Sequence, residues 1–535
     1  MDISRLTYRQ TGFFSPLIAD YIDEHVNTTA LYSFPFSLQG FKKAIEYRKN
    51  KPVNRGALLT AIEKQYTQGN TTPSAKTAEN IALLKDEYTF TIVTGHQLCL
   101  FTGPLYLIYK LIDTIILAAQ LKQQFPLYNF VPVYWMHTED GDIEEINHTY
   151  LFNKKLHWAD AGQGAAGMLS TQTIQPVIDE LATLLGDSEQ AKELLALVKE
   201  SYLNHTNLAD ATRHFVNTLL GNYGLVILDP NERELKSEFS SILEDEFTNA
   251  SAHKLVNQTN AQLVQQGYTA QVNPRELNLF YINKGLRYRL VKTDNGFATA
   301  ANEFTFTAEE ISKLIKETPE VFSPNVVLRP LYQEVILPNI CYVGGGGELA
   351  YWLQYKAFFN HYKYELPVLA LRSSYLIVEG AQATRMQKFG FDAAAIFDSA
   401  DNLVKRYLQT TGGDELSLSA ERGEAAAFYA KLSAKAALTD TTLTGSIEAE
   451  NKKLENFLNG LEAKLLKAQK TKDEATVNQI RKLKESLFPE GTLQERYTNF
   501  MQFYLKQGPA FFDTILANAA IMEKKFTVVT LPQNK

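Results

Sequence analysis

The fold is set by the stretch Thr94-Gly95-His96-Gln97-Leu98-Cys99-Leu100-Phe101-Thr102-Gly103-Pro104-Leu105-Tyr106, which separates a strand-like run from a helix-like run. The strand-like run is 88–93, and Pro104 suits the first turn of the helix, where its missing N–H costs nothing. Glycine loops between a strand and a helix hold phosphates or carboxylates in α/β sheets, because backbone N–H groups point outward there. The stretch matches neither a P-loop nor the dinucleotide fingerprint. It therefore predicts an anion-binding loop of another kind.

The loop residues that we expect to contact a nucleotide or another anion are Gly95, His96, Gln97, Thr102 and Gly103. Lys110 lies two turns into the following helix, which favours a position too far from the loop to help. Cys99 lies inside an apolar run, where a thiolate is disfavoured, so covalent catalysis through this residue is not expected.

A second strand, 130–136, is a continuous apolar run, as expected when helices cover both faces of a parallel sheet. The right-handed crossover rule makes it a neighbour, or nearly so, of the strand at 88–93. Residues 137–148 then hold five carboxylates and two histidines, just past the strand end where open α/β sheets bind ligands. The cluster could act as a general base, bind a substrate ammonium or hold Mg²⁺. The alternative is that its acids only cap a helix N-terminus, a placement worth about 0.3–1 kcal/mol each.

Opposite the glycine loop of the neighbouring strand, this cluster favours a functional site. The catalytic residues that we predict are Asp140, Asp142, Glu145 and His148. We expect Trp135 and Glu139 to contact the substrate. His137 and His148 could ligate a metal, but isolated histidines near a strand end more often satisfy hydrogen bonds, and no spacing fits a structural zinc site. We therefore predict no metal ligands among them.

The second half of the sheet is expected at 322–378, beginning with 322–334. An apolar strand, 340–343, runs into four glycines at 344–347, and the next strand, 367–372, ends at an arginine. Each glycine beyond the one or two that a turn needs costs roughly 0.5–1 kcal/mol of chain entropy, so the run favours close approach of a ligand to the backbone. A permissive turn is the alternative. The predicted substrate contacts in this half are Asn325, Arg329, Gln333, Glu334, Gly344, Gly345, Gly346, Gly347, Glu348, Trp352 and Arg372.

Composition and length describe a soluble, multi-unit globular protein. The chain has 535 residues, 45% hydrophobic and 21% charged, with a formal charge of −7 that argues against nucleic-acid binding. We expect its two cysteines to be buried, reduced thiols. The N-terminus lacks the apolar core of a signal peptide, and charges interrupt the most apolar long run, 105–121, so we expect no membrane span and a cytoplasmic location.

We expect five segments along the chain. Residues 1–150 hold N-terminal helices and the first half of the core; 151–320 form a mixed α/β insertion that can also supply a strand near 225–230, with a hairpin at 280–290 and a capping box at Thr307. Residues 321–380 complete the core, 381–490 form a helical arm, and 491–535 give two helices and a strand that pack on the core.

The arm carries the spacing of a coiled-coil seam. The seam positions are Leu454, Leu458, Leu461, Leu465 and Ala468, and the phase shifts after 470–474. As one helix, residues 446–488 would span about 65 Å. Such an arm seldom stands alone, so we expect it to pair with another helix and to mediate dimerisation.

Several blocks of this sequence resemble the bacillithiol biosynthesis cysteine-adding enzymes, a family of cysteine ligases. The resemblance covers the whole chain, and the blocks occur in the family's order. They are Thr94–Gln97 with Leu100–Tyr106 and Tyr109-Lys110, Pro132–Met136 through Glu139-Asp140, Glu145–His148, Asn325–Glu334 and Gly347–Trp352. Two departures are Gly141, where the family is expected to have a histidine, and the all-glycine run at 344–347.

The resemblance implies an α/β fold with a Rossmann-like parallel-sheet core, connective insertions resembling those of class I aminoacyl-tRNA synthetases, and an α-helical coiled coil that makes a homodimer. It implies addition of L-cysteine to the amino group of glucosaminyl-malate, with ATP or ADP as the nucleotide and Mg²⁺ as its companion ion. Arg329 and Arg372 would hold the malyl carboxylates. The competing hypotheses are a non-catalytic coiled-coil dimer that binds a nucleotide or sugar acid, and a nucleotidyltransferase that activates another amino acid.

Overall fold

The computed structural model describes residues 2–411 and 418–531, and at its centre lies a parallel sheet of order β13-β12-β2-β3-β6. The strands are β2 (Thr89–His96), β3 (Asn129–Met136), β6 (Val226–Leu228), β12 (Asn339–Gly344) and β13 (Val368–Leu371). Each was predicted as a strand, and their continuous apolar runs are buried on both faces. Counted along the chain, the order reads 5-4-1-2-3, which is the Rossmann arrangement. The order reverses between β2 and β12, so ligands are expected beyond the carboxyl ends of these two strands.

Helices cover this sheet. The crossover helix α6 (Tyr106–Gln124) packs against β2, β3 and β12, and α3 (Leu38–Lys49) packs against β12 and β13. The other N-terminal helices are α1 (Tyr8–Thr11), α2 (Pro16–Ile22), α4 (Arg55–Gln68) and α5 (Ala75–Leu83). Between β3 and β6 lie α7 (Ile143–Ile146), the hairpin β4 (His148–Leu151) and β5 (Lys154–His157), and α8 (Gln175–Leu185), α9 (Glu189–Leu203) and α10 (Leu208–Leu220).

An antiparallel sheet of order β10-β9-β8-β7-β11 interrupts the core between β6 and β12. Its strands are β7 (Leu279–Asn283), β8 (Leu286–Thr293), β9 (Gly296–Thr299), β10 (Thr305–Phe306) and β11 (Phe322–Pro324). The helices of this insertion are α11 (Arg233–Ser237), α12 (Ser240–Asn249), α13 (Ser251–Gln265), α14 (Ala308–Glu317) and α15 (Arg329–Ile336). The predicted hairpin of β7 and β8 and the predicted capping box at Thr307 are both present.

One prediction about the sheet was wrong. Residues 322–334 were expected to begin its second half, but β11 pairs with β7 in the antiparallel sheet and 329–336 is the helix α15. Except for Val326, the apolar residues of this segment are buried, and Pro330 suits the first turn of a helix. The core sheet therefore resumes only at β12, while β6, from the segment 151–320, forms its far edge.

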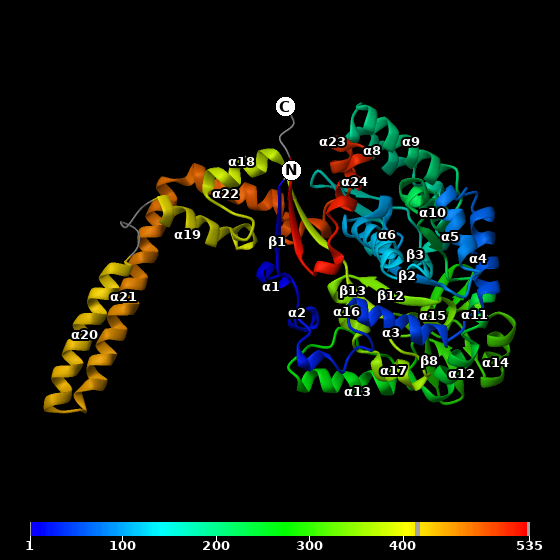
Figure 1. The fold of residues 1–535 in the computed structure, drawn as a ribbon, viewed down its shortest axis with the longest axis horizontal. Coiled ribbons are helices and arrows are strands. Elements are labelled where there is room, and N and C mark those ends of the chain that lie inside the picture. Colours follow the sequence, from blue (N-terminus) through cyan, green and yellow to red (C-terminus); the bar gives the residue numbers. More distant parts are fainter. Residues whose placement is uncertain (1, 412–417, 532–535) are drawn as a thin grey trace.

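The arm is a helical hairpin that projects from the body (Figure 1). It consists of α20 (Ser419–Thr439) and α21 (Leu443–Lys472), which pack on each other, so the predicted partner helix comes from the same chain. The single helix expected over 446–488 breaks at Asp473, and α22 (Glu474–Leu487) continues it. The phase shift marks this break: the later apolar positions, Val477, Ile480, Leu483 and Leu487, are buried, whereas α21 has no buried residue.

The first and last strands of the chain lie side by side next to the core (Figure 1). The strand β15 (Phe526–Thr530) pairs antiparallel with β1 (Asp2–Leu6) and parallel with β14 (Ser374–Val378). The remaining helices are α16 (Gly346–Trp352), α17 (Lys356–His361), α18 (Gly380–Phe389), α19 (Ala400–Thr411), α23 (Met501–Gln507) and α24 (Ala510–Asn518). None of the described helices is long and apolar enough to cross a membrane.

Candidate functional site

A cleft of about 630 Å³ lies where the strand order reverses, between the ends of β2, β3 and β12 and the inserted antiparallel sheet. Predicted site residues make up much of its wall. Those that line it are His96, Gln97, Trp135, Glu139, Asp140, Glu145, Asn325, Arg329, Gly345, Gly347, Glu348 and Arg372. The cleft thus brings together side chains from three segments of the chain that the sequence had singled out separately.

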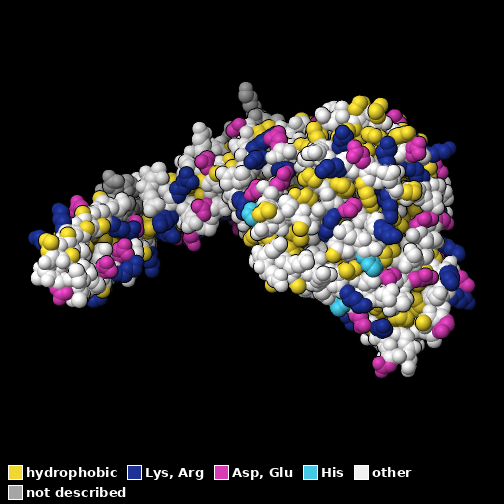
Figure 2. Space-filling model, turned by 60° about the horizontal axis from the view of Figure 1, so that its bottom comes forward, with side chains coloured by type: hydrophobic (Ala, Val, Ile, Leu, Met, Phe, Trp, Pro, Cys, Tyr) yellow, Lys and Arg dark blue, Asp and Glu magenta, His cyan; other side chains and the backbone are white. Residues whose placement is uncertain are grey.

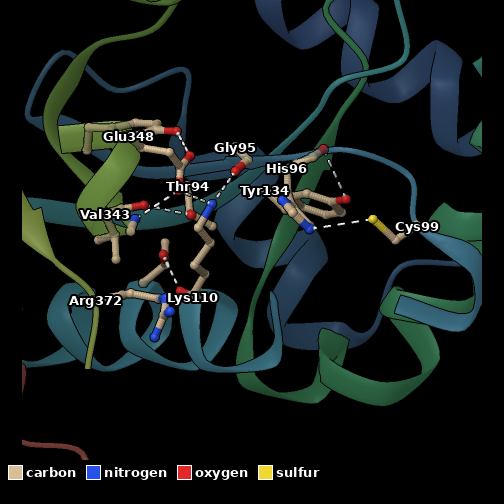
Figure 3. A network of polar contacts seen from close by, with 12 residues as sticks. Thr94, Gly95, His96, Cys99, Lys110, Tyr134, Val343, Glu348 and Arg372 are labelled. Carbon is tan, nitrogen blue, oxygen red and sulfur yellow. Dashed lines mark hydrogen bonds and ion pairs between the residues drawn. The ribbon is translucent and has the colours of Figure 1, made fainter. Parts of the chain in front are cut away.

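Gly95 and Lys110 connect β2 to the second half of the sheet. The ammonium of Lys110 donates a hydrogen bond of 2.9 Å to the carbonyl oxygen of Gly95 and forms an ion pair with Glu348 (Figure 3). Lys110 was predicted to lie too far away to help. That prediction was wrong, because a helical side chain leans toward the helix N-terminus, which here brings the ammonium back to the loop.

Glu348 is held by three donors. Its carboxylate accepts hydrogen bonds from the Tyr342 hydroxyl at 2.7 Å and from the backbone N–H of Gly345 at 2.8 Å, besides pairing with Lys110. Although burial opposes ionisation, the nearby Lys110 and these hydrogen bonds lower the pKa of Glu348 to about 2. Glu348 therefore stays ionised and fixes the wall of the cleft.

The acidic wall of the cleft is organised by Gln97. Its side-chain amide donates hydrogen bonds of 2.8 Å to both Asp140 and Glu145. Arg287 of β8 lies 3.6 Å from the Asp140 carboxylate, and its guanidinium stacks over the Phe280 ring at 3.8 Å. Two carboxylates are thus held side by side at the rim of the cleft, where they can bind an amine or accept its proton.

The carboxylate of Glu139 forms a buried ion pair beside the cleft. It pairs with the fully buried ammonium of Lys236 on α11, which also donates to the carbonyl oxygen of Phe322 at 2.8 Å. Glu139 borders the cleft, but this ion pair fixes it against the insertion. Glu139 therefore neutralises Lys236, and its contact with the substrate stays a prediction.

His96 and Cys99 do not form an activated pair. Cys99 Sγ lies 3.7 Å from Nε2 of His96 (Figure 3). Burial, together with the charge of Lys110, lowers the pKa of His96 to about 3, and burial raises the pKa of the Cys99 thiol to about 12. The imidazole is neutral and the thiol protonated at neutral pH, as the apolar surroundings of Cys99 predict.

Arg329 is a buried cation without an anionic partner among the described residues. The residue is 8% exposed, and its guanidinium lies 5.9, 5.6 and 6.0 Å from the ring centroids of Trp135, Tyr342 and Trp352. Nη1 donates to Gln333 at 3.2 Å, and Nη2 has no hydrogen-bond partner. A buried charge is costly unless it is paired, so this guanidinium is suited to an anionic ligand.

Arg372 is largely used by the protein itself. Its Nη2 donates to the buried carboxylate of Glu495 at 2.7 Å, and its Nη1 donates to the backbone oxygen of Ser373 and to the hydroxyl of Ser374. Only Nε has no partner. Arg372 thus already binds a carboxylate of the protein through Nη2. Arg329 is therefore the better candidate to bind a carboxylate of the ligand.

The rest of the glycine loop packs inside the protein. Residue Gly103 has φ +62°, and a Cβ there would lie 2.6 Å from the Cβ of Cys99. The carbonyl oxygen of Gly103 accepts a hydrogen bond from the Asn499 side chain, and Thr102 is buried. Of the predicted anion-binding residues, only His96 and Gln97 line the cleft, so the loop offers fewer residues to a ligand than expected.

Other predicted residues lie away from the cleft. Asp142 is exposed before α7, and His148 lies half-buried on β4 beside Asn147. Gln333 and Glu334 are buried behind Arg329, where Glu334 accepts a hydrogen bond from Asn339 at 2.7 Å. Trp352 is buried against Tyr342. These residues support the site from behind or stand outside it.

The four glycines at 344–347 have different surroundings. None has a positive φ. A Cβ on Gly344 would lie 2.9 Å from the Tyr342 ring, and one on Gly346 would face Phe14 and Ile18. Only Gly345 and Gly347 line the cleft, and a Cβ on Gly347 would meet nothing within 4 Å. Close packing explains the glycine at 344, and the open position at Gly347 leaves room for a ligand.

Several residues that line the cleft were not predicted from the sequence. They are Tyr106, Lys110, His137, Gln271, Arg275, Phe280, Arg287, Tyr351 and Arg496. His137 begins the acidic cluster, which was the available signal for it. The residues of the insertion come from a segment that carries no local motif, and only the folding of the insertion over the sheet brings them to the cleft. Among the described residues, no group of three or more His, Cys, Asp and Glu side chains is placed to hold a metal ion.

Fold and site together define a Rossmann-like α/β protein with a ligand cleft at the reversal of strand order and a helical-hairpin arm. Residues 1–373 match the family model of the bacillithiol biosynthesis BshC N-terminal Rossmann-like domain, and residues 375–531 match that of the BshC C-terminal coiled-coil domain. The chain belongs to the BshC family of bacillithiol biosynthesis.

Relatives match over nearly the full chain. A protein of Flavobacterium johnsoniae named "Putative cysteine ligase BshC" is 40% identical over 528 residues, which cover 98% of this chain and 99% of that protein. Proteins with the same name from Flavobacterium psychrophilum and Christiangramia forsetii are 40% and 38% identical. The match with the Flavobacterium psychrophilum protein covers 98% of both chains, and the match with the Christiangramia forsetii protein covers 99% of both.

Proposed function

We propose that this protein joins L-cysteine to the amino group of glucosaminyl-malate through an amide bond in bacillithiol biosynthesis. The observation that carries the proposal is the division of charge in the cleft: Asp140 and Glu145 stand on one wall, and the unpaired Arg329 stands on another. This division suits substrates that bear both an amine and carboxylates. The family membership and the names of the relatives support the same activity.

In the proposed reaction, Arg329 holds a malyl carboxylate, and Asp140 or Glu145 accepts the proton that the attacking amine loses. The new bond joins the amine nitrogen to the carboxyl carbon of cysteine, and the bond from that carbon to its leaving oxygen breaks. Gln97 keeps the two carboxylates in place through its two hydrogen bonds of 2.8 Å. General acid–base catalysis of this kind contributes typically 10²–10⁴-fold.

ATP is the proposed source of activation, because it supplies the group that turns the carboxyl oxygen of cysteine into a leaving group. The cleft fits an anionic ligand: Arg275, Arg287 and Arg496 line it, besides the unpartnered Nη2 of Arg329. Mg²⁺ bound with a nucleotide needs only one or two protein carboxylates. Asp140 and Glu145 are the carboxylates of the cleft that could serve, since Glu139 and Glu348 each hold a buried lysine more closely than the 3.6 Å at which Asp140 pairs with Arg287.

We also propose that the protein is a homodimer through its arm. Large apolar side chains are exposed along the hairpin, namely Phe428, Leu438, Leu443, Phe457 and Leu461. In Figure 2, hydrophobic side chains lie among charged ones along the arm. A second arm would cover these side chains. The free, buried thiols of Cys99 and Cys341 suit the reducing cytoplasm as the compartment.

The experiment that tests the activity is incubation with cysteine, ATP and glucosaminyl-malate, followed by mass spectrometry of the products. We expect the cysteinyl amide, together with AMP or ADP. Binding of the substrates without turnover would favour a sensor or assembly factor instead. ATP turnover with an amino acid other than cysteine would favour a nucleotidyltransferase of different specificity.

A further inference from the structure

Two neighbouring side chains that line the cleft each carry a buried nitrogen atom without a hydrogen-bond partner. The two atoms are Nε2 of His137, just past the end of β3, and Nη2 of Arg329, on α15. A Cβ built on Gly95 would lie 2.6 Å from Nε2 of His137 and 3.5 Å from Nη1 of Arg329. Both side chains therefore close over Gly95, and the absence of a side chain on this residue leaves them the space.

The two groups differ in charge. Burial and the neighbouring Arg329 guanidinium lower the pKa of His137 well below its ordinary value. The imidazole is therefore neutral at neutral pH, and one of its ring nitrogens carries a proton that it can donate. Arg329 is always charged, and among the described residues it has no ion-pair partner. A neutral donor and a permanent cation beside each other present two N–H groups for one anion.

We propose that His137 is a substrate-binding residue that, together with Arg329, holds one carboxylate group of the substrate. His137 Nε2 carries the proton and donates to one carboxylate oxygen, and Arg329 Nη2 donates to the other. A buried polar group that lacks a partner costs free energy, so two adjacent ones indicate a missing ligand. A carboxylate has two oxygens that accept both bonds in one plane.

This inference rests on the proposed function for the identity of the substrate, and it adds a residue and a binding role to it. The carboxylate has two sources in that reaction, the malyl group and cysteine. Malate and cysteine therefore serve as separate probes, and inorganic phosphate serves as an anion of another shape.

The test is isothermal titration of the full chain and its variants with each probe. Removal of one charge-assisted hydrogen bond by His137→Leu is expected to weaken binding of malate about ten- to hundredfold. His137→Gln keeps an N–H donor near the position of Nε2 and should recover most of the affinity. His157→Leu is the matched control, because His157 is exposed on β5 and away from the cleft. Thermal melting of each variant shows whether its fold is intact.

A loss confined to malate assigns the pair to the malyl carboxylate, and a loss confined to cysteine assigns it to the carboxylate of that substrate. Wild-type affinity of folded His137→Leu for both probes, or a loss seen only with phosphate, would overturn the proposal. Failure of His137→Gln to recover binding would also contradict it. These titrations need no turnover, so the site can stand if ligation is not observed. Conversely, ligation by His137→Leu with an unchanged KM for glucosaminyl-malate and for cysteine would overturn the site and leave the proposed function intact.

Discussion

Lys110 of α6 and Glu348 of α16 form an ion pair across the point where the strand order reverses. The pair ties the first half of the sheet to the second, because Lys110 also contacts the Gly95 carbonyl and Glu348 contacts the Gly345 N–H. Lys110 and Glu348 both line the cleft. The shape of the site therefore depends on a pair that contributes no group to the proposed chemistry.

Breaking this pair should destabilise the protein unequally from its two sides. Glu348→Gln leaves the fully buried ammonium of Lys110 without its anion, which is expected to lower the free energy of unfolding by about 3–5 kcal/mol. Lys110→Met should lower it by less, since Glu348 keeps its hydrogen bonds from Tyr342 and Gly345. Urea unfolding of both variants and of the double variant measures the difference. A larger loss in Lys110→Met than in Glu348→Gln would contradict this account.

Substitution of two neighbouring acids in the 137–148 cluster should affect different properties, activity for Asp140 and stability for Glu139. Asp140→Asn is expected to reduce kcat about 10²–10⁴-fold with little change in stability, because Asp140 lies at the rim of the cleft. Glu139→Gln should instead lower the free energy of unfolding by about 3–5 kcal/mol, because it leaves Lys236 buried and uncompensated. Ligation kinetics and urea unfolding of both variants separate the two roles. Near-wild-type kcat in Asp140→Asn would remove this residue from the mechanism.

Gly95→Ala should damage the site without breaking the sheet. The added Cβ would lie 2.6 Å from Nε2 of His137 and 3.3 Å from the Tyr342 hydroxyl, so the imidazole must move. We expect at least a tenfold loss of kcat/KM with the melting temperature lowered by only a few degrees, as for a local overpacking of about 1–2 kcal/mol. Gly56→Ala is the matched control, since Gly56 lies outside the cleft and its Cβ would meet only Oδ1 of Asn54 at 3.5 Å. Equal activity of the two variants would contradict the crowding at Gly95.

The raised pKa of Asp113 should be visible in the pH dependence of the free energy of unfolding. Burial raises the pKa of this carboxyl to about 7 in the folded protein, against the usual value near 3.9 when unfolded. The folded state then binds more protons between these values, so the contribution of Asp113 to the free energy of unfolding falls as pH rises from about 4 to 7. Urea unfolding across this range should show a shallower decrease in Asp113→Asn. An identical slope in the variant would refute the shift.

The arm should control the oligomeric state. Replacing Phe428 and Phe457, which are 58% and 64% exposed, by serine removes the two largest apolar side chains of its surface. We expect the double variant to sediment as a monomer in analytical ultracentrifugation while the wild type sediments as a dimer. Leu127→Ser is the control, because Leu127 is 83% exposed on the body. A wild-type protein that is monomeric at micromolar concentration would contradict the proposed dimer.

The core sheet could be predicted because its strands are buried on both faces and therefore read as continuous apolar runs, as in 130–136. The short strand β11 was misassigned for the same reason. Its three residues are also buried, and two of them, Phe322 and Pro324, are apolar. Such a pattern does not tell which of the two sheets a strand joins. The shift in apolar phase near 470–474 correctly marked a change, although its cause, the passage from the exposed arm to the body, needed the structure.

The site was predicted where motif residues lie at strand ends, as for Asp140 and Gln97. Long-range partners decided the remaining roles. The partner of Glu139 is 97 residues away at Lys236, and the partner of Arg372 is 123 residues away at Glu495. No local pattern reveals such a pair. The sequence therefore located the acids of the cleft and two of its arginines, Arg329 and Arg372, but could not tell which of them are already neutralised.

The most direct test of the central claim is mass spectrometry of a reaction that contains the purified protein, cysteine, ATP and glucosaminyl-malate. The account predicts the cysteinyl amide of glucosaminyl-malate from the wild type and at least a hundredfold less from a folded Asp140→Asn variant. Absence of the amide from the wild-type reaction, with all three substrates present and the protein folded, would contradict it.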